Sequence, residues 1–130
     1  MLFRSLRFEQ KDGRLRNILR PEVPARAGLH APVVLRDVLA AANIPRSQVA
    51  GWVLHPGGRD VLVALQEQMG LTEDDLRWSA AVLREFGNLS SASVLFVLQD
   101  ALAESAPGGY WWMSSFGAGF SCQGALLEVE

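Results

Sequence analysis

The sequence predicts an α/β fold in which helices are layered on a mixed β-sheet and one apolar helix lies buried at the centre. Three observations lead to this prediction. Strand-like runs occur near both ends and in the middle of the chain, helical runs lie between them, and one helical run is apolar on nearly every side. Strands and helices mixed in this way pack as helices on a sheet. A length of 130 residues suits one domain with a core of its own.

The first half of the chain contains the patterns of a hairpin, two helices and a buried strand. Apolar and charged residues alternate on both sides of the turn at Asp12-Gly13, which is typical of a β-hairpin. Pro32 precedes an alanine- and leucine-rich run and should mark the start of a helix or kink it. The predicted elements are a hairpin over 6–19, a helix over Val33–Ala42, a strand over Val49–Leu54 and a helix over Arg59–Met69 that ends at Gly70.

The second half contains two helical runs followed by two strands. Thr72 and Asp75 have the spacing of a capping box, which predicts a helix from there toward Phe86. The run Asn88–Ala103 is apolar on nearly every side, so its helix should be buried on every side. A chain of this size has difficulty enclosing such a helix, and we expect a second copy or another domain to cover it. The predicted strands are Tyr110–Phe116 and Ser121–Val129, joined by a flexible bend.

Composition excludes several classes of protein. The formal net charge is −2, and eleven of the twelve basic residues are arginines scattered along the chain, so a nucleic-acid partner is not expected. The longest strongly apolar stretch, Ala92–Leu98, is far too short to span a bilayer. The N-terminal residues contain arginines and lack the apolar core of a signal peptide. One cysteine forms no internal disulfide. We therefore expect a soluble cytoplasmic protein that binds neither membrane nor nucleic acid.

Two polar residues stand where apolar runs begin or end. His55 follows an apolar run and leads directly into Pro56-Gly57-Gly58, while Asn88 opens the run that contains the central helix. Two neutral hydrogen-bond donors at the ends of regular elements can stabilise a developing oxyanion. Structural alternatives remain open for each: the histidine could hydrogen-bond a turn, Asn88 could be a helix N-cap, and Ser90 could be a small residue that permits close helix packing.

Three motifs resemble the C-terminal region of the chalcone and stilbene synthases, the type III polyketide synthases, which have the thiolase fold. These motifs are Trp52–Gly58, Leu83–Leu98 and Phe116–Gly119. They occur in the order and at the approximate spacing of that family, and the resemblance extends from about Leu6 to Val129. It implies that residues 1–130 form a single thiolase-like half, equivalent to the C-terminal domain of these synthases.

The resemblance also implies an activity. Members of this family condense an acyl-CoA starter with malonyl-CoA by decarboxylation, and CoA thioesters are substrates with no further cofactor or metal. His55 and Asn88 match the catalytic histidine and asparagine, whose N–H groups would hold the malonyl thioester carbonyl while carbon dioxide leaves. The residues that match substrate-binding positions are Gly57 and Gly58, along the pantetheine arm, and Ser90, Phe116, Gly117 and Gly119, around the polyketide cavity.

One part of the family site has no counterpart in this sequence. The family's nucleophilic cysteine lies in an N-terminal domain that is absent here, and Cys122 lacks the basic neighbours that would activate a thiol. The bend also has Ala118 where the family usually has proline. We therefore expect half of a synthase, inactive alone, that forms a homo-oligomer and requires the cysteine-bearing domain or a separate subunit. Two alternatives remain: a non-catalytic binding or scaffold protein, and a stand-alone malonyl-CoA decarboxylase.

Overall fold

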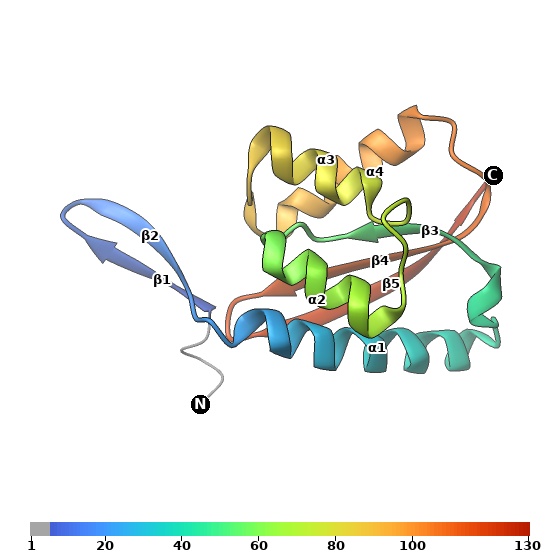
Figure 1. Ribbon diagram of the computed structural model, residues 1–130, viewed down its shortest axis with the longest axis horizontal. Coiled ribbons are helices and arrows are strands. Elements are labelled where there is room, and N and C mark those ends of the chain that lie inside the picture. Colours follow the sequence, from blue (N-terminus) through green and yellow to red (C-terminus); the bar gives the residue numbers. More distant parts are fainter. Residues whose placement is uncertain (1–5) are drawn as a thin grey trace.

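The computed structural model describes residues 6–130 and contains two separate sheets with four α-helices (Figure 1). The N-terminal hairpin forms a two-stranded sheet that projects from the remaining structure. The elements are β1 (Leu6–Lys11), β2 (Arg14–Leu19), α1 (Val23–Ala42), β3 (Val49–Leu54), α2 (Arg59–Met69), α3 (Arg77–Phe86), α4 (Ser93–Ala103), β4 (Gly109–Gly117) and β5 (Ser121–Val129), with short 3₁₀ helices at Arg46–Gln48 and Ser90–Ala92.

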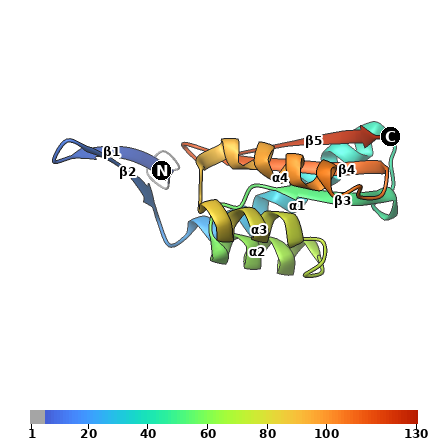
Figure 2. The same ribbon diagram turned by 90° about the horizontal axis from the view of Figure 1, so that it is seen from above.

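The larger sheet has the strand order β3-β4-β5 and is mixed, because β3 is parallel to β4 while β5 is antiparallel to it. Neighbouring residues of a strand point to opposite faces. Trp112 packs into one core cluster with α1 and α2, and Trp111 packs into a second cluster with α3 and α4. Helices thus cover both faces, as the views in Figures 1 and 2 show. The predicted arrangement of helices on a mixed sheet is confirmed.

Two glycines allow the tryptophans of β4 to pack flat against neighbouring strands. A Cβ at Gly51 would lie 2.7 Å from the ring of Trp111, and a Cβ at Gly124 would lie 2.2 Å from the ring of Trp112. Real carbon atoms do not approach so closely, so glycine is required at both positions. The centre of the sheet therefore depends on small residues in β3 and β5.

Helix α3 contacts the end of β3. Ser79 of α3 is fully buried, and its hydroxyl oxygen accepts a hydrogen bond from the backbone N–H of Leu54 at 3.2 Å. The same hydroxyl donates to the backbone carbonyl of Leu54 at 2.8 Å. A buried backbone group without a partner is costly. Ser79 thus satisfies the last residue of β3, directly before His55.

Helix α1 begins ten residues earlier than predicted, at Val23 instead of Val33. Pro24 occupies the first turn, where the missing N–H of proline costs no hydrogen bond. Pro32 lies inside the helix, so it neither starts nor ends it. The small and apolar residues Ala27, Ala31 and Leu35 form a buried stripe along the helix. Burial of this stripe offsets the helix-breaking tendency of Pro32.

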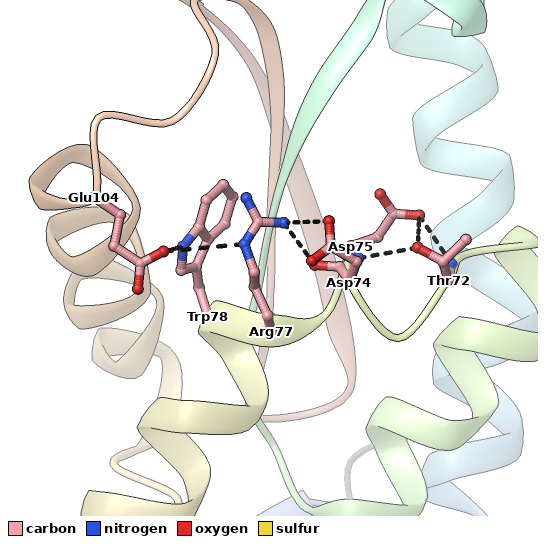
Figure 3. Close-up of polar contacts among 6 residues, drawn as sticks. All are labelled: Thr72, Asp74, Asp75, Arg77, Trp78 and Glu104. Atoms are coloured by element: carbon pink, nitrogen blue, oxygen red, sulfur yellow. Dashed lines mark hydrogen bonds and ion pairs between the residues drawn. The ribbon is translucent and has the colours of Figure 1, made fainter.

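The capping-box pair forms, although the helix does not begin there. The backbone N–H of Thr72 donates to the Asp75 carboxylate at 2.8 Å, and the N–H of Asp75 donates to the Thr72 hydroxyl at 3.1 Å (Figure 3). The residues that follow form a turn, and α3 starts only at Arg77. The guanidinium of Arg77 lies 3.9 Å above the Trp78 ring, whose N–H donates to Glu104 at 2.7 Å. These contacts join the start of α3 to the end of α4.

The central helix is shorter and less buried than predicted. It begins at Ser93, because 3₁₀ turns and irregular backbone occupy the preceding residues. Val94, Val97 and Ala101 of α4 are buried against the sheet and α3. The opposite side is exposed, and we define the apolar surface as Phe86, Leu89, Leu95, Phe96 and Leu102, which are 40–59% exposed. The described residues therefore bury α4 on one side only. They include no helix that meets the length and hydropathy needed to span a bilayer.

Candidate oxyanion site

His55 is held at the carboxyl end of β3. Its backbone N–H donates to the carbonyl of Ser114 at 2.9 Å, which continues the pairing of β3 with β4. The side chain is 4% exposed. Gly58 turns the chain into α2 with a φ of +141°, a conformation that residues with side chains rarely adopt. The Pro-Gly-Gly segment thus ends the strand, starts the helix and leaves the imidazole at the junction.

The hydrogen bonds of His55 determine its tautomer. The backbone N–H of Phe116 donates to Nδ1 at 3.2 Å, so Nδ1 keeps its lone pair and the ring proton resides on Nε2. This Nε2–H is directed at Oδ1 of Asn88, at 3.3 Å. Burial lowers the pKa of His55, while the hydrogen bond with Asn88 acts in the opposite direction. The neutral imidazole is therefore favoured near pH 7, with its N–H at the site.

Asn88 approaches from the loop between α3 and α4. Gly87 ends α3 with a φ of +72°. Oδ1 of Asn88 also accepts the backbone N–H of Ser90 at 2.9 Å, and Nδ2 donates to the carbonyl of Gly57 at 3.2 Å. These partners determine which side-chain atom is oxygen and leave one Nδ2 hydrogen for another acceptor. Asn88 is not the N-cap of α4, contrary to the structural alternative, because that helix begins five residues later.

The glycine loop, which we define as Gly57-Gly58, lies beside the imidazole. A Cβ at Gly57 would lie 3.9 Å from Nε2 of His55, so the missing side chain leaves space beside this nitrogen. A groove of about 420 Å³ adjoins the loop, and its lining includes Arg20, Pro24, Gly57, Gly58 and Arg59. A ligand in this groove would pass along the loop with close access to the backbone.

The other predicted binding residues differ in their relation to His55. Phe116 is buried, with its ring centre 6.1 Å from that of the imidazole. Ser90 has a φ of +65°, and its backbone N–H donates a hydrogen bond to Oδ1 of Asn88. Gly117 pairs with Ser121 at the end of the β4–β5 hairpin, and Gly119 lies in its turn with a φ of +72°. Phe116 and Ser90 thus contact the histidine–asparagine pair, whereas the two glycines shape the turn beside it.

One residue of this region, Phe120, belongs to none of the three sequence motifs. Phe120 is 8% exposed and stacks on Phe116 with ring centres 5.8 Å apart. It also lies 5.9 Å from the ring of His30 in α1. In the sequence, this role is indicated by a large aromatic residue directly after Gly119, at a place where tight turns favour small residues. The turn therefore has an aromatic anchor that motif comparison alone does not identify.

Cys122 does not complete the site. It pairs with Phe116 across the β4–β5 hairpin and is half-buried. Burial raises the pKa of its thiol to about 11, so the sulfur is protonated at neutral pH and a poor nucleophile. Both ring nitrogens of His55 already have other partners. The sequence-based expectation that Cys122 is not an activated thiol agrees with this environment.

Comparison with known proteins gives a consistent assignment. Residues 11–128 match the model of the chalcone and stilbene synthase C-terminal domain. A 3,5-dihydroxyphenylacetyl-CoA synthase of Streptomyces toyocaensis is 34% identical over 123 residues, which are 93% of this chain and 32% of that enzyme.

Solved structures show the same fold. PKS-I from the brown alga Ectocarpus siliculosus has a TM-score of 0.85 and 29% identity, over 99% of this chain and 36% of that one. A type III pentaketide synthase from Neurospora crassa has a TM-score of 0.83 and 27% identity, over 98% of this chain and 38% of that one. The chain spans about a third of the length of these relatives. The thiolase-like architecture and the matched domain together show that this chain belongs to the chalcone and stilbene synthase family of type III polyketide synthases, as its C-terminal domain.

Proposed function

We propose that this chain is the C-terminal catalytic half of a decarboxylative condensing acyltransferase that uses malonyl-CoA and an acyl-CoA starter. The observation that carries the proposal is the meeting of His55 and Asn88 at 3.3 Å, with the histidine proton placed on Nε2 by Phe116. The Nε2–H of His55 is directed at Oδ1 of Asn88, and Nδ2 of Asn88 has one hydrogen besides the one that it donates to Gly57. We further propose that the reaction draws on CoA thioesters alone, without another cofactor or a metal.

The chemistry needs donors at the thioester oxygen. When malonyl-CoA loses carbon dioxide, the electron pair of the broken C–C bond delocalises onto the thioester oxygen as an enolate. Nε2–H of His55 and Nδ2–H of Asn88 would donate to this oxygen, and removing one such donor typically costs about 3–4 kcal/mol of transition-state stabilisation. The distance of 3.3 Å between Nε2 and Oδ1 is long for a hydrogen bond. An anionic oxygen could therefore displace the asparagine oxygen.

The remaining step requires a thiolate from another polypeptide segment. A cysteine would first take the starter acyl group from CoA, releasing CoA as a thiol. The enolate carbon would then attack this acyl thioester, forming the new C–C bond and releasing the cysteine thiolate. The product is a CoA thioester extended by two carbons. Cys122, with its raised pKa and its place in the hairpin, is not assigned to this role.

We assign the apolar surface to contact with the cysteine-bearing half, which is either an N-terminal domain or a separate subunit. Phe86 and Phe96 contact each other there, with ring centres 5.8 Å apart, and remain partly exposed. An apolar surface of this kind marks an interaction site. The same half would supply the thiol, so one contact would both bury α4 and complete the site. We further propose that the assembled protein is a homo-oligomer in the cytoplasm.

A chimera tests the proposal directly. Residues 11–128 would replace the matched C-terminal segment of the Streptomyces toyocaensis synthase, and carbon dioxide release and product formation would be measured with malonyl-CoA. We expect condensation by the chimera and its loss, by about 10²–10³-fold, in the Asn88→Ala chimera. The matched control is Gln48→Ala, an exposed amide outside the site, which should retain activity.

The isolated chain distinguishes the remaining functions. We expect no condensation when it is incubated alone with malonyl-CoA and an acyl-CoA, because no activated thiol is present. Polyketide formation by the chain alone would refute the half-enzyme proposal. Carbon dioxide release that is abolished by Asn88→Ala would instead indicate a decarboxylase. A folded chimera that binds malonyl-CoA but neither decarboxylates nor condenses it would indicate a binding or scaffold protein.

A further inference from the structure

Four aromatic rings form a row that begins at the oxyanion site. The ring of His55 lies 6.1 Å from Phe116, Phe116 lies 5.8 Å from Phe120, and Phe120 lies 5.9 Å from His30. The Phe116 and Phe120 rings are stacked, with an angle of 18° between their planes. The row therefore connects the end of β3, the β4–β5 turn and helix α1.

Phe120 holds an unfavourable backbone conformation within this row. Its φ is +57°, in the left-handed region that is sterically costly for a large side chain. Such a conformation persists only when surrounding contacts stabilise it, and it often occurs at functional sites. Phe120 is 8% exposed and belongs to the core cluster of α1 and α2. Packing of its ring thus holds the turn in a shape that the backbone alone would not favour.

The turn shape matters because the backbone of Phe116 contacts the imidazole. The N–H of Phe116 is the group that donates to Nδ1 of His55. Phe116 pairs with Cys122 at the closed end of the hairpin, so a change in the turn would displace this N–H. We propose that Phe120 is a positioning residue: its ring, packed between Phe116 and His30, keeps the Phe116 N–H on Nδ1 and thereby keeps the His55 proton on Nε2. The importance of this positioning for catalysis rests on the proposed function of His55.

Nuclear magnetic resonance of the whole chain tests the inference without turnover. The ¹⁵N shifts of His55 report its tautomer, and hydrogen exchange of the Phe116 amide reports its hydrogen bond. In Phe120→Leu, which retains apolar volume but lacks a flat ring, we expect both His55 tautomers to be populated. Exchange of the Phe116 amide should accelerate at least about tenfold, equivalent to about 1.4 kcal/mol. Phe120→Tyr keeps the ring and should restore the wild-type tautomer and exchange rate.

A matched core variant separates positioning from general stability. Leu126 of β5 packs against the same cluster as Phe120 but is outside the aromatic row. Leu126→Ala should lower the melting temperature while His55 remains protonated on Nε2. An unchanged tautomer in Phe120→Leu, or an equal change in Leu126→Ala, would overturn the positioning role. The readout is independent of catalysis, so an inactive chimera with a Phe120-dependent tautomer would refute the proposed function and leave this inference standing.

Discussion

The backbone N–H of Phe116 donates to Nδ1 of His55 at 3.2 Å, although the two residues are 61 positions apart in the sequence. Parallel pairing of β3 with β4 produces this contact, because Leu54 lies opposite Ser114 and both strands run in the same direction. One backbone group of β4 thus selects the tautomer of a side chain at the end of β3. The position of the imidazole N–H is therefore set by the register of β3 and β4.

The lowered pKa of His55 predicts a loss of stability in mild acid. Unfolding returns the histidine to its ordinary pKa of about 6.5, whereas burial lowers the pKa in the folded protein. The unfolded chain therefore binds a proton more readily. The stability that neutral His55 contributes to the folded protein is present above pH 6.5 and is lost as the pH falls from there toward the lowered pKa. Urea denaturation at pH 7.5, 6.5 and 5.5 should show this decline, and His55→Gln should reduce it. An identical decline in both proteins would contradict the assignment to His55.

Ser79→Ala removes a single oxygen atom, yet it should destabilise the protein strongly. The substitution leaves both the N–H and the carbonyl of Leu54 without their buried partner. Loss of one such partner typically costs about 1–3 kcal/mol, so we expect a decrease of about 2–4 kcal/mol in the free energy of unfolding. Ser91→Ala is the control, because Ser91 is exposed. Equal denaturation midpoints for the two variants would show that Ser79 does not stabilise the end of β3.

Local patterns were sufficient to predict several elements. The strand Val49–Leu54 and the helix Arg59–Met69 have the predicted limits, because Pro56, Gly58 and Gly70 terminate or cap them through their own backbone preferences. The start of α1 could not be predicted in this way. Proline disfavours the interior of a helix, and the helix continues through Pro32 because its buried stripe packs against elements distant in the sequence.

The candidate site likewise combines features that follow from local sequence patterns with features that depend on the tertiary structure. The motif residues His55 and Asn88 meet, as their resemblance to the family implied. The contact between Phe116 and Nδ1 depends on strand register, and the packing of Phe120 depends on α1, so neither follows from a local pattern. The exposed side of α4 differs from the prediction for a physical reason. An apolar sequence indicates burial but does not say whether the covering surface belongs to the same chain.

Gly124→Ala should disrupt the centre of the sheet. The added carbon would lie 2.2 Å from the ring of Trp112, which is fully buried and has no space to move. Overpacking of this kind costs about 1–3 kcal/mol and sometimes more, and we expect the upper end of that range. Gly57→Ala is the matched control, since its nearest neighbour would be 3.6 Å away, at ordinary contact distance. Thermal unfolding of the two variants would test this difference, and similar melting temperatures would contradict it.

The apolar surface predicts association through α4. Leu95 and Leu102 are separated by seven residues and so lie on one side of the helix, where they are 59% and 53% exposed. We expect the isolated chain to self-associate, and the double substitution Leu95→Lys with Leu102→Lys to make it monomeric, because a charged side chain buried without a partner opposes contact. Sedimentation velocity over a range of concentrations measures this. Val63→Lys changes an exposed apolar residue of α2, 43% exposed, and should leave association intact. A wild-type chain that remains monomeric throughout, or a chimera whose activity survives the double substitution, would show that this side of α4 needs no cover.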